Sequence, residues 1–286
     1  MTLRVFLFFC ALIIFGSALS DFREPLADDE LPKKHRIVTL SPHLAEIVYA
    51  SGAGEYMVGV MAGTNYPVDA IKHPVVGGFN GVDFEAIITL EPTIVLAWEE
   101  GNKAADISKL ERLGIPVYIL SATDLFDLEH QIIDVSHLFG TEKTANELIL
   151  SIKNKILSID RHRRSNRHTK VFIKIWDKPI FTIGRDHYIN EALKLCGVTN
   201  VGEKYPFTAG SVSIETMLLS GADTILDLTG VDLVNDSKAI SLFHFYRSLS
   251  MKTIEADSQL LMRLSPRFVD GLDELCARIA EPFEGV

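Results

Sequence analysis

A segment in the first half of the chain recurs about 130 residues later with the same spacing. The two copies cover residues 82–96 and 212–226, and in each a glutamate precedes an apolar helical run that leads into a β-rich run. The repeat is longer than the period of solenoids, which is roughly 20–50 residues. It therefore predicts two related lobes. Lobes that face each other enclose a cleft, where ligand sites prefer to form.

Short β-rich runs alternate with helical patterns along the chain. The runs at residues 36–40, 93–98, 116–120 and 171–175 are separated by stretches with apolar residues at helical spacing. Strands that alternate with helices imply crossover connections and a mainly parallel sheet. The predicted fold class is α/β, with two Rossmann-like lobes of mainly parallel sheets joined by a long α-helix.

A single apolar stripe from Ala145 to Ile159 predicts that long helix. Thr144 and Glu147 have the spacing of a capping box at its start. We therefore expect an N-terminal lobe over residues 36–140, a connecting helix over 141–168 and a C-terminal lobe over 169–286.

The first 20 residues have the composition of an export signal. Arg4 precedes an apolar run from Val5 to Gly16, and the small residues of Ala18-Leu19-Ser20 follow at cleavage spacing. The run is shorter than the roughly 20 apolar residues that span a bilayer. We interpret residues 1–20 as a cleavable signal peptide for export to the periplasm. A buried N-terminal element and an uncleaved anchor are the alternatives.

Charge and cysteine content limit the partners and the compartment. The formal net charge of -10 argues against nucleic acid as a partner, because such proteins need a basic face. Removal of the signal peptide leaves two cysteines, Cys196 and Cys276. Disulfides persist in oxidising compartments, so we predict that the two are bonded. Two separate buried thiols are the alternative.

The sequence has no motif of the common hydrolases or nucleotide-binding enzymes. It contains no G-x-S-x-G, no H-E-x-x-H and no P-loop, and its nine histidines form no close ligand pair. We expect no catalytic residue, no metal site and no cofactor, and hence a binding protein. An enzyme built on the same fold and a structural protein with an unused cleft are the rival classes.

Aromatic residues stand near predicted strand ends in both halves of the chain. Open α/β sheets bind ligands in the crevice outside the carboxyl ends of their strands. Rings placed there would hold a large, partly apolar ligand by burying surface, at about 25 cal/mol per Å². Each ring taken alone could equally belong to the core. The five residues are Tyr66, Phe79, Trp98, Phe181 and Phe207.

The repeated glutamates, Glu85 and Glu215, allow two interpretations. A carboxylate in the first turn of a helix is stabilised by the helix dipole, so both could be ordinary helix-end charges. They could also be docking charges for basic residues on a partner, which would orient binding and raise its rate.

With these residues laid out, the chain resembles the periplasmic cobalamin-binding proteins of bacterial ABC importers. These belong to a wider class of solute-binding proteins that also carries haem and ferric siderophores. The resemblance spans nearly the whole mature chain. The segments that carry it are Arg36 to Pro42, Asn65-Tyr66-Pro67, Glu85, Ile94 to Trp98 with Gly101-Asn102, Phe181-Thr182, Glu215 and Ser265-Pro266-Arg267.

The resemblance implies a non-enzymatic receptor with cobalamin, or a related corrinoid, as its transported ligand. Delivery would be to an ABC permease dimer and its ATPase, with Glu85 and Glu215 meeting permease arginines. Haem or a ferric siderophore is the alternative ligand, and we expect a monomer. The resemblance also places Cys196 and Cys276 where the family forms its disulfide. The ligand contacts it implies are Gly63, Tyr66, Phe79, Trp98, Phe181, Phe207, Gln259, Leu260, Leu261, Met262 and Arg263.

The chain departs from the family at several of these positions. Gly63 stands where the family often has a tyrosine, and Phe79 and Phe207 stand where tryptophans are common. Gln259 and Leu260 replace an acidic and an aromatic residue. Each departure removes ring area or a polar contact, which implies weaker binding or a preference for another corrinoid.

Overall fold

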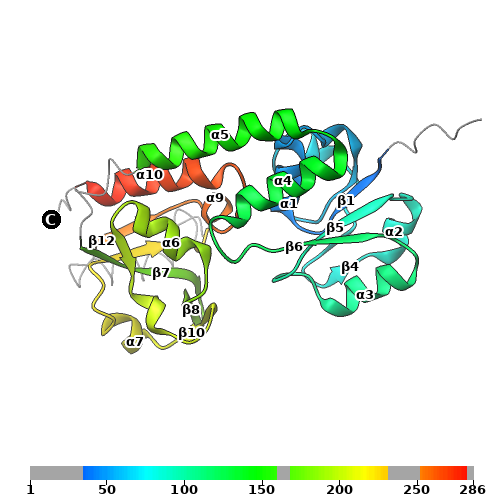
Figure 1. Ribbon diagram of the computed structural model, residues 1–286. Helices are drawn as coiled ribbons and strands as arrows, with labels where there is room; N and C mark the ends of the chain where they lie inside the picture. The colour runs from blue at the N-terminus through cyan, green and yellow to red at the C-terminus, as the bar shows by residue number, and fades with distance from the viewer. Residues whose placement is uncertain (1–34, 160–167, 231–251, 282–286) are drawn as a thin grey trace, which may run out of the picture. The chain divides into compact units, whose positions relative to one another are not determined.

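The computed structural model describes residues 35–159, 168–230 and 252–281 (Figure 1). These residues belong to one compact unit. The predicted signal peptide at residues 1–20 lies outside the described residues. The domain boundaries expected at 36–140, 141–168 and 169–286 stay a prediction.

The first sheet is wholly parallel, as the alternating pattern predicted. Its strands, in spatial order, are β2 (Met57–Gly59), β1 (Ile37–Thr39), β5 (Ile94–Trp98) and β6 (Val117–Leu120). The helices that connect them are α1 (Pro42–Ala50), α2 (Phe84–Thr89) and α3 (Ala104–Arg112), and α4 (Asp127–Phe139) follows β6. Central strand residues such as Val38, Val95 and Leu96 are fully buried, which is typical of a parallel sheet covered on both faces.

The second sheet is mixed. Its strands are β7 (Thr169–Asp177), β8 (Ile180–Ile183), β9 (Val198–Asn200), β10 (Ala209–Val212), β11 (Thr224–Asp227) and β12 (Lys252–Glu255). Their order is β10-β8-β7-β11-β12, with β9 also paired to β7. The pairs among β7, β9, β11 and β12 are parallel, whereas β8 and β10 are antiparallel to their neighbours. Only Lys178 and Pro179 separate β7 from β8, which is too short for a parallel crossover.

The predicted long helix is α5 (Glu142–Ile159), and it packs on α4 and on the last helix, α10 (Phe268–Ala280) (Figure 1). The capping-box prediction at Thr144 is wrong, because α5 begins at Glu142. Helix α4 ends in a left-handed turn at Gly140 (φ 66°), and the Ala145 amide already donates to the Thr141 carbonyl at 3.1 Å. The chain therefore re-enters a helix as soon as this turn is complete.

The repeated segment folds in the same way in both copies. In the first, β4 (Gly81–Val82) leads through Asp83 into α2 and then β5, and in the second β10 leads through Ser213 into α7 (Ile214–Leu218) and then β11. The Asp83 carboxylate accepts the Ala86 amide at 3.0 Å, and the Ser213 hydroxyl accepts the Thr216 amide at 3.2 Å. Such N-caps stabilise a helix by about 1 kcal/mol.

The predicted disulfide is present. Cys196 follows α6 (Tyr188–Leu195) and is bonded to Cys276 in α10, with a Cα–Cα distance of 5.9 Å and a sequence separation of 80. Both cysteines are fully buried in the core. In the chain-entropy account, closing so long a loop stabilises the fold by about 4 kcal/mol.

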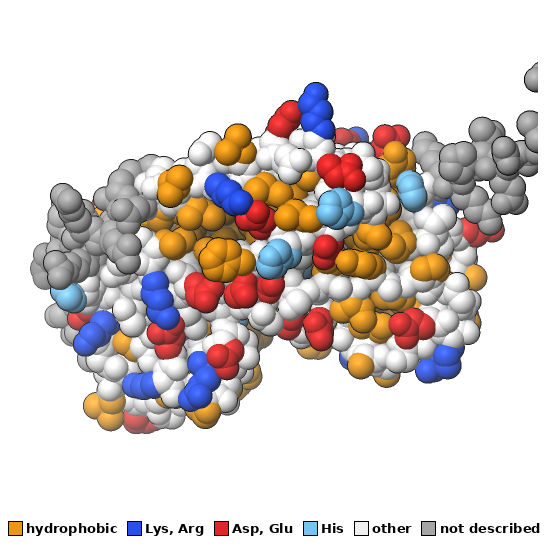
Figure 2. Space-filling view, in the orientation of Figure 1, with side chains coloured by type: hydrophobic (Ala, Val, Ile, Leu, Met, Phe, Trp, Pro, Cys, Tyr) orange, Lys and Arg blue, Asp and Glu red, His pale blue; other side chains and the backbone are white. Residues whose placement is uncertain are grey.

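The surface carries charges of both signs. On the face shown in Figure 2, acidic and basic side chains are interspersed with apolar ones. Within the described ranges, no helix is long and apolar enough to cross a membrane.

Candidate functional site

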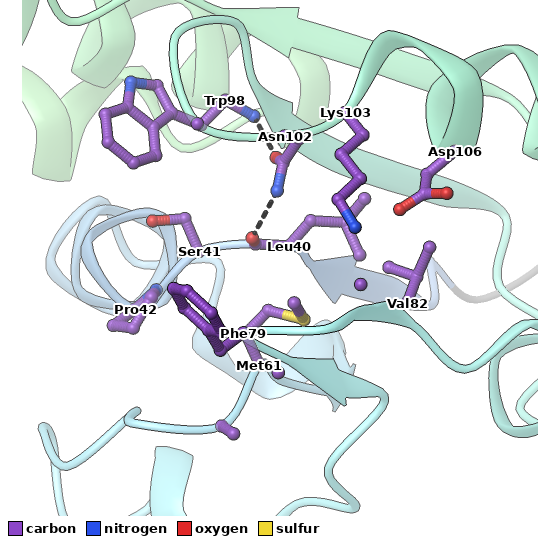
Figure 3. Close-up of a pocket in the computed structure, with 14 residues that line it drawn as sticks. Leu40, Ser41, Pro42, Met61, Phe79, Val82, Trp98, Asn102, Lys103 and Asp106 are labelled. Atoms are coloured by element: carbon purple, nitrogen blue, oxygen red, sulfur yellow. Dashed lines mark hydrogen bonds between the residues drawn. The ribbon is translucent and has the colours of Figure 1, made fainter.

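A pocket of about 260 Å³ opens at the carboxyl ends of β1 and β5 (Figure 3). Ser41 and Pro42 follow β1, Trp98 ends β5, and Phe79 comes from the hairpin of β3 (Gly77–Gly78) and β4. This is the edge at which parallel α/β sheets bind ligands. The lining residues that the sequence had not indicated as ligand contacts include Met61, Lys103 and Asp106.

Asn102 joins the ends of the two strands. Its side-chain oxygen accepts the backbone amide of Trp98 at 2.6 Å, and its amide nitrogen donates to the Leu40 carbonyl at 2.9 Å (Figure 3). An amide side chain can do both because it carries an acceptor and two donors. These bonds fix the backbone from which Trp98 projects.

The ring of Trp98 is half-buried and firmly packed. It meets the ring of His43 edge-on, with centroids 5.2 Å apart and an angle of 85°. The indole also lies against Gly101, where an added β-carbon would come within 2.0 Å of the ring. Edge-to-face packing and a close backbone approach hold the ring in one orientation.

His43 is buried beside the pocket and is neutral. Its Nδ1 lies 2.5 Å from the Ser41 hydroxyl. Burial, aided by the positive charge of Arg263, lowers the pKa of His43 to about 3. An uncharged imidazole therefore stands behind Trp98 at physiological pH.

Phe79 stands at the tip of the β3–β4 hairpin and is fully exposed. Gly81 has φ 125°, a conformation that side chains rarely adopt, so the tight turn requires a glycine there. Lys103 donates to the Asn80 carbonyl at 3.0 Å and holds the tip. The ring is thus available to a ligand without any loss of packing.

Residues far apart in sequence meet at Gly63 and Asn65. Arg263 donates to the Asn65 side-chain oxygen at 2.7 Å and to the Gly63 carbonyl at 2.9 Å. The Asn65 amide also donates to the Gln259 side chain. Gly63 has φ 85°, so a tyrosine in its place would be strained. The structure thus brings together the predicted contacts Gly63, Gln259 and Arg263.

Tyr66 lies next to this cluster. The Arg267 guanidinium stands 4.0 Å from the centre of its ring, a cation–π contact, and Arg267 is paired with the buried carboxylate of Glu46. Hydrogen bonding to Glu46 raises the pKa of Arg267, whereas burial lowers the pKa of Arg263. Both guanidinium groups stay charged.

The segment from Leu260 to Met262 is only partly available to a ligand. It begins in the short helix α9 (Ser258–Leu261). The Leu261 side chain is 1% exposed and belongs to the core, so it cannot face a ligand. The side chains of Leu260 and Met262 are half-buried.

Phe181 and Phe207 belong to the second sheet. Phe181 lies on β8 opposite Ser211 of β10, and Phe207 precedes β10 and stacks on Tyr205 with centroids 5.4 Å apart. Phe207 packs on Gly210, where an added β-carbon would come within 3.0 Å of the ring. Both phenylalanines are half-buried.

A larger and more polar pocket of about 720 Å³ lies around the start of α6. Its lining includes Thr123, Asp124, Arg185 and His187, as well as the ion pair between Lys194 and Glu203 at 2.6 Å. None of the predicted ligand contacts lines it.

Glu85 and Glu215 occupy equivalent places, in the first turns of α2 and α7, and both are exposed. The Ser213 side chain hydrogen-bonds to Glu215 and lowers its pKa. Both positions fit either interpretation, because a solvated helix end and a docking point each need exposure.

In the part of the chain that the structure describes, no three His, Cys, Asp or Glu side chains come close enough to hold a metal ion.

Glu46 was not predicted from the sequence as a site residue. It stands among Leu44, Ile47 and Val48, a pattern that predicts an apolar helix face but not a buried charge. Arg267 was visible only as part of the Ser265-Pro266-Arg267 segment.

A profile of the periplasmic binding protein family matches residues 37–239. The chain belongs to the periplasmic binding protein family. It is 26% identical over 249 residues to a vitamin B12-binding protein of Vibrio cholerae, covering 84% of this chain and 87% of that protein.

Two solved structures agree with this assignment. The crystal structure of the periplasmic vitamin B12 binding protein BtuF of Vibrio cholerae has a TM-score of 0.75 and 25% identity, covering 86% of this chain and 96% of that one. The periplasmic heme-binding protein RhuT from Roseiflexus sp. RS-1 has a TM-score of 0.76 and 21% identity, covering 87% and 100%, which supports the fold alone.

Family membership settles the broad class of activity. These proteins are periplasmic and bind solutes, so the prediction of a non-enzymatic binding protein is confirmed. What such a protein binds is a transported ligand and not a cofactor. The prediction of a two-lobed α/β fold is confirmed as well.

Proposed function

We propose that this protein captures cobalamin, or a closely related corrinoid, in the periplasm and delivers it to an ABC permease in the inner membrane. The observation that carries the proposal is the pocket wall formed by Trp98 and Phe79 at the carboxyl ends of β1 and β5. The vitamin B12-binding relatives support the same ligand class.

The chemistry of the site suits a corrinoid. A corrinoid has a broad apolar macrocycle edged by amide groups. Trp98 and Phe79 offer ring surface for the macrocycle. Asn65, Gln259 and Arg263 offer donors and acceptors for amides, and neutral His43 adds no charge that would favour an ionised ligand.

The proposed contacts extend over both sheets. They comprise the backbone of Gly63 and the side chains of Tyr66, Phe79, Trp98, Phe181, Phe207, Gln259, Leu260, Met262 and Arg263. Leu261 contributes only through its backbone, because its side chain lies in the core.

Delivery to the permease depends on Glu85 and Glu215 in this proposal. Their equivalent, exposed positions in the repeat support a role as a pair of docking charges for permease arginines. The receptor acts as a monomer, reaches the periplasm through the signal peptide at residues 1–20, and meets a permease dimer driven by its ATPase.

Haem and ferric siderophores are the alternative ligands, since heme-binding proteins share this fold. Haem carries two carboxylates and a metal that takes an axial ligand, so it would place different demands on Tyr66 and Arg263 than an amide-edged macrocycle does.

The test is calorimetric titration of the mature protein with cyanocobalamin, beside hemin and a ferric siderophore in the same buffer. We expect one-to-one, sub-micromolar binding of cyanocobalamin alone. Binding of hemin or the siderophore without cyanocobalamin would keep the transport role and overturn the ligand.

A further inference from the structure

Glu46 is a buried carboxylate that receives hydrogen bonds from the far end of the chain. It lies on α1, its side chain is 1% exposed, and its partners follow 219 and 221 residues later. A carboxylate is retained in such surroundings only when it is paired and fully hydrogen-bonded. The apolar pattern of α1 gives no reason for a charged side chain at this position.

Both carboxylate oxygens of Glu46 have partners. Glu46 Oε2 accepts the Ser265 hydroxyl at 2.8 Å and Arg267 Nε at 2.9 Å, while Oε1 accepts Arg267 Nη2 at 2.6 Å and lies 3.6 Å from Arg263 Nη1. Two parallel N–H bonds from one guanidinium to one carboxylate fix the plane of both groups. Arg267 therefore has a single orientation on Glu46.

Both arginines go on to hold residues of the proposed ligand site. Arg263 reaches the Gly63 carbonyl and the Asn65 side chain, and Arg267 covers the ring of Tyr66. Arg263 uses two of its five N–H groups in these hydrogen bonds, and its Nη1 also lies 3.6 Å from Glu46 Oε1.

We propose that Glu46 is a positioning residue for the ligand site: its carboxylate fixes Arg263 and Arg267 before the ligand arrives, so that residues 63–66 and 259–263 form one preformed surface. The inference rests on the proposed function. A preformed surface raises affinity because fewer side chains lose freedom on binding.

The variant Glu46→Gln tests this, because glutamine keeps the size of the side chain and loses the charge. We expect it to bind cyanocobalamin about tenfold more weakly, equivalent to ~1.4 kcal/mol. The matched control is Glu55→Gln, the same change at an exposed glutamate in the short helical turn Gly54–Tyr56, which should leave binding unchanged.

A double-mutant cycle with Arg263→Gln separates positioning from a general structural role. If Glu46 acts through Arg263, then the loss of affinity caused by Glu46→Gln is smaller once Arg263 is already replaced, and what remains comes from Arg267, which Glu46 also holds. Independent penalties that add in the double variant would overturn the inference. If Glu46→Gln does not fold, Arg267→Lys takes its place in the cycle, since it keeps the charge and loses the paired N–H bonds.

The outcomes also separate this inference from the proposed function. If the wild-type protein does not bind cyanocobalamin, the proposed ligand is wrong, and the same cycle is run with hemin. If a probe binds and the cycle is additive, the ligand stands and the role of Glu46 is wrong. If neither probe binds, both are overturned.

Discussion

The indole of Trp98 lies directly over Gly101, and a β-carbon there would come within 2.0 Å of the ring. Gly101→Ala must therefore displace the ring from its packed position. Because Trp98 forms a wall of the pocket, we expect cyanocobalamin binding to weaken about tenfold, or ~1.4 kcal/mol. Calorimetric titration measures the change.

Tryptophan fluorescence shows whether the ring has moved. The chain has two tryptophans, so Trp176→Phe leaves Trp98 as the sole reporter. Gly101→Ala in that background should shift the Trp98 emission maximum. Unchanged emission together with unchanged affinity would contradict the packing argument.

Replacement of Phe79 by alanine should weaken ligand binding and leave stability unchanged. The ring is fully exposed in the free protein, so its removal leaves no cavity, but it would be buried under a ligand. We expect a loss of about 1–2 kcal/mol in affinity and a change of less than ~0.5 kcal/mol in the free energy of unfolding. Leu157→Ala, at a side chain 74% exposed on α5, is the control. Equal effects of the two variants on binding would show that Phe79 does not belong to the ligand site.

Joint replacement of Glu85 and Glu215 should separate delivery from capture. Both carboxylates are exposed and lie outside the pocket at Trp98, so Glu85→Ala with Glu215→Ala should leave the Kd for cyanocobalamin unchanged. Uptake by cells that depend on this receptor should fall at least about tenfold, since docking would lose two charge pairs. Normal uptake would show that both residues are only helix-end charges and not docking charges.

His43 makes the protein less stable in acid. Its pKa is about 3 in the fold against an ordinary value of 6.5, so below pH 6.5 the unfolded chain binds a proton that the folded chain does not. The free energy of unfolding therefore falls as the pH falls from 6.5 towards 3, by up to ~1.4 kcal/mol per pH unit. Burial lowers the pKa of His187 to about 4, which acts in the same direction.

Urea unfolding at pH 7 and pH 5 measures this contribution. Between the two values the wild-type protein should lose about 2 kcal/mol more than His43→Gln does. The same loss in both proteins would show that His43 titrates normally in the fold.

Local patterns predicted most of the fold. The runs at 36–40, 93–98 and 116–120 form strands because their periodicity and flanking turns agree with the final packing. The start of α5 was misplaced because the left-handed turn at Gly140, not the capping-box spacing, sets where the helix begins. The antiparallel β8 and β10 were not predicted, since a general alternation of strands and helices carries no information on each connection.

The site was predictable only in part. Aromatic residues at strand ends pointed to Trp98 and Phe79, because the sheet edge that binds ligands follows from the strand direction. The cluster of Glu46, Arg263 and Arg267 depends on contacts across more than 200 residues, which no local pattern encodes. Leu261 stays a predicted contact, but its side chain lies in the core because it ends the short helix α9.

The repeated unit keeps its geometry while changing its chemistry, since an aspartate caps one copy and a serine the other. A single polypeptide thereby presents twice a capped helix start with a glutamate in its first turn. A partner protein built from two identical subunits can accordingly be recognised by one copy of this chain. The two-fold symmetry of such a partner does not require a dimeric ligand carrier.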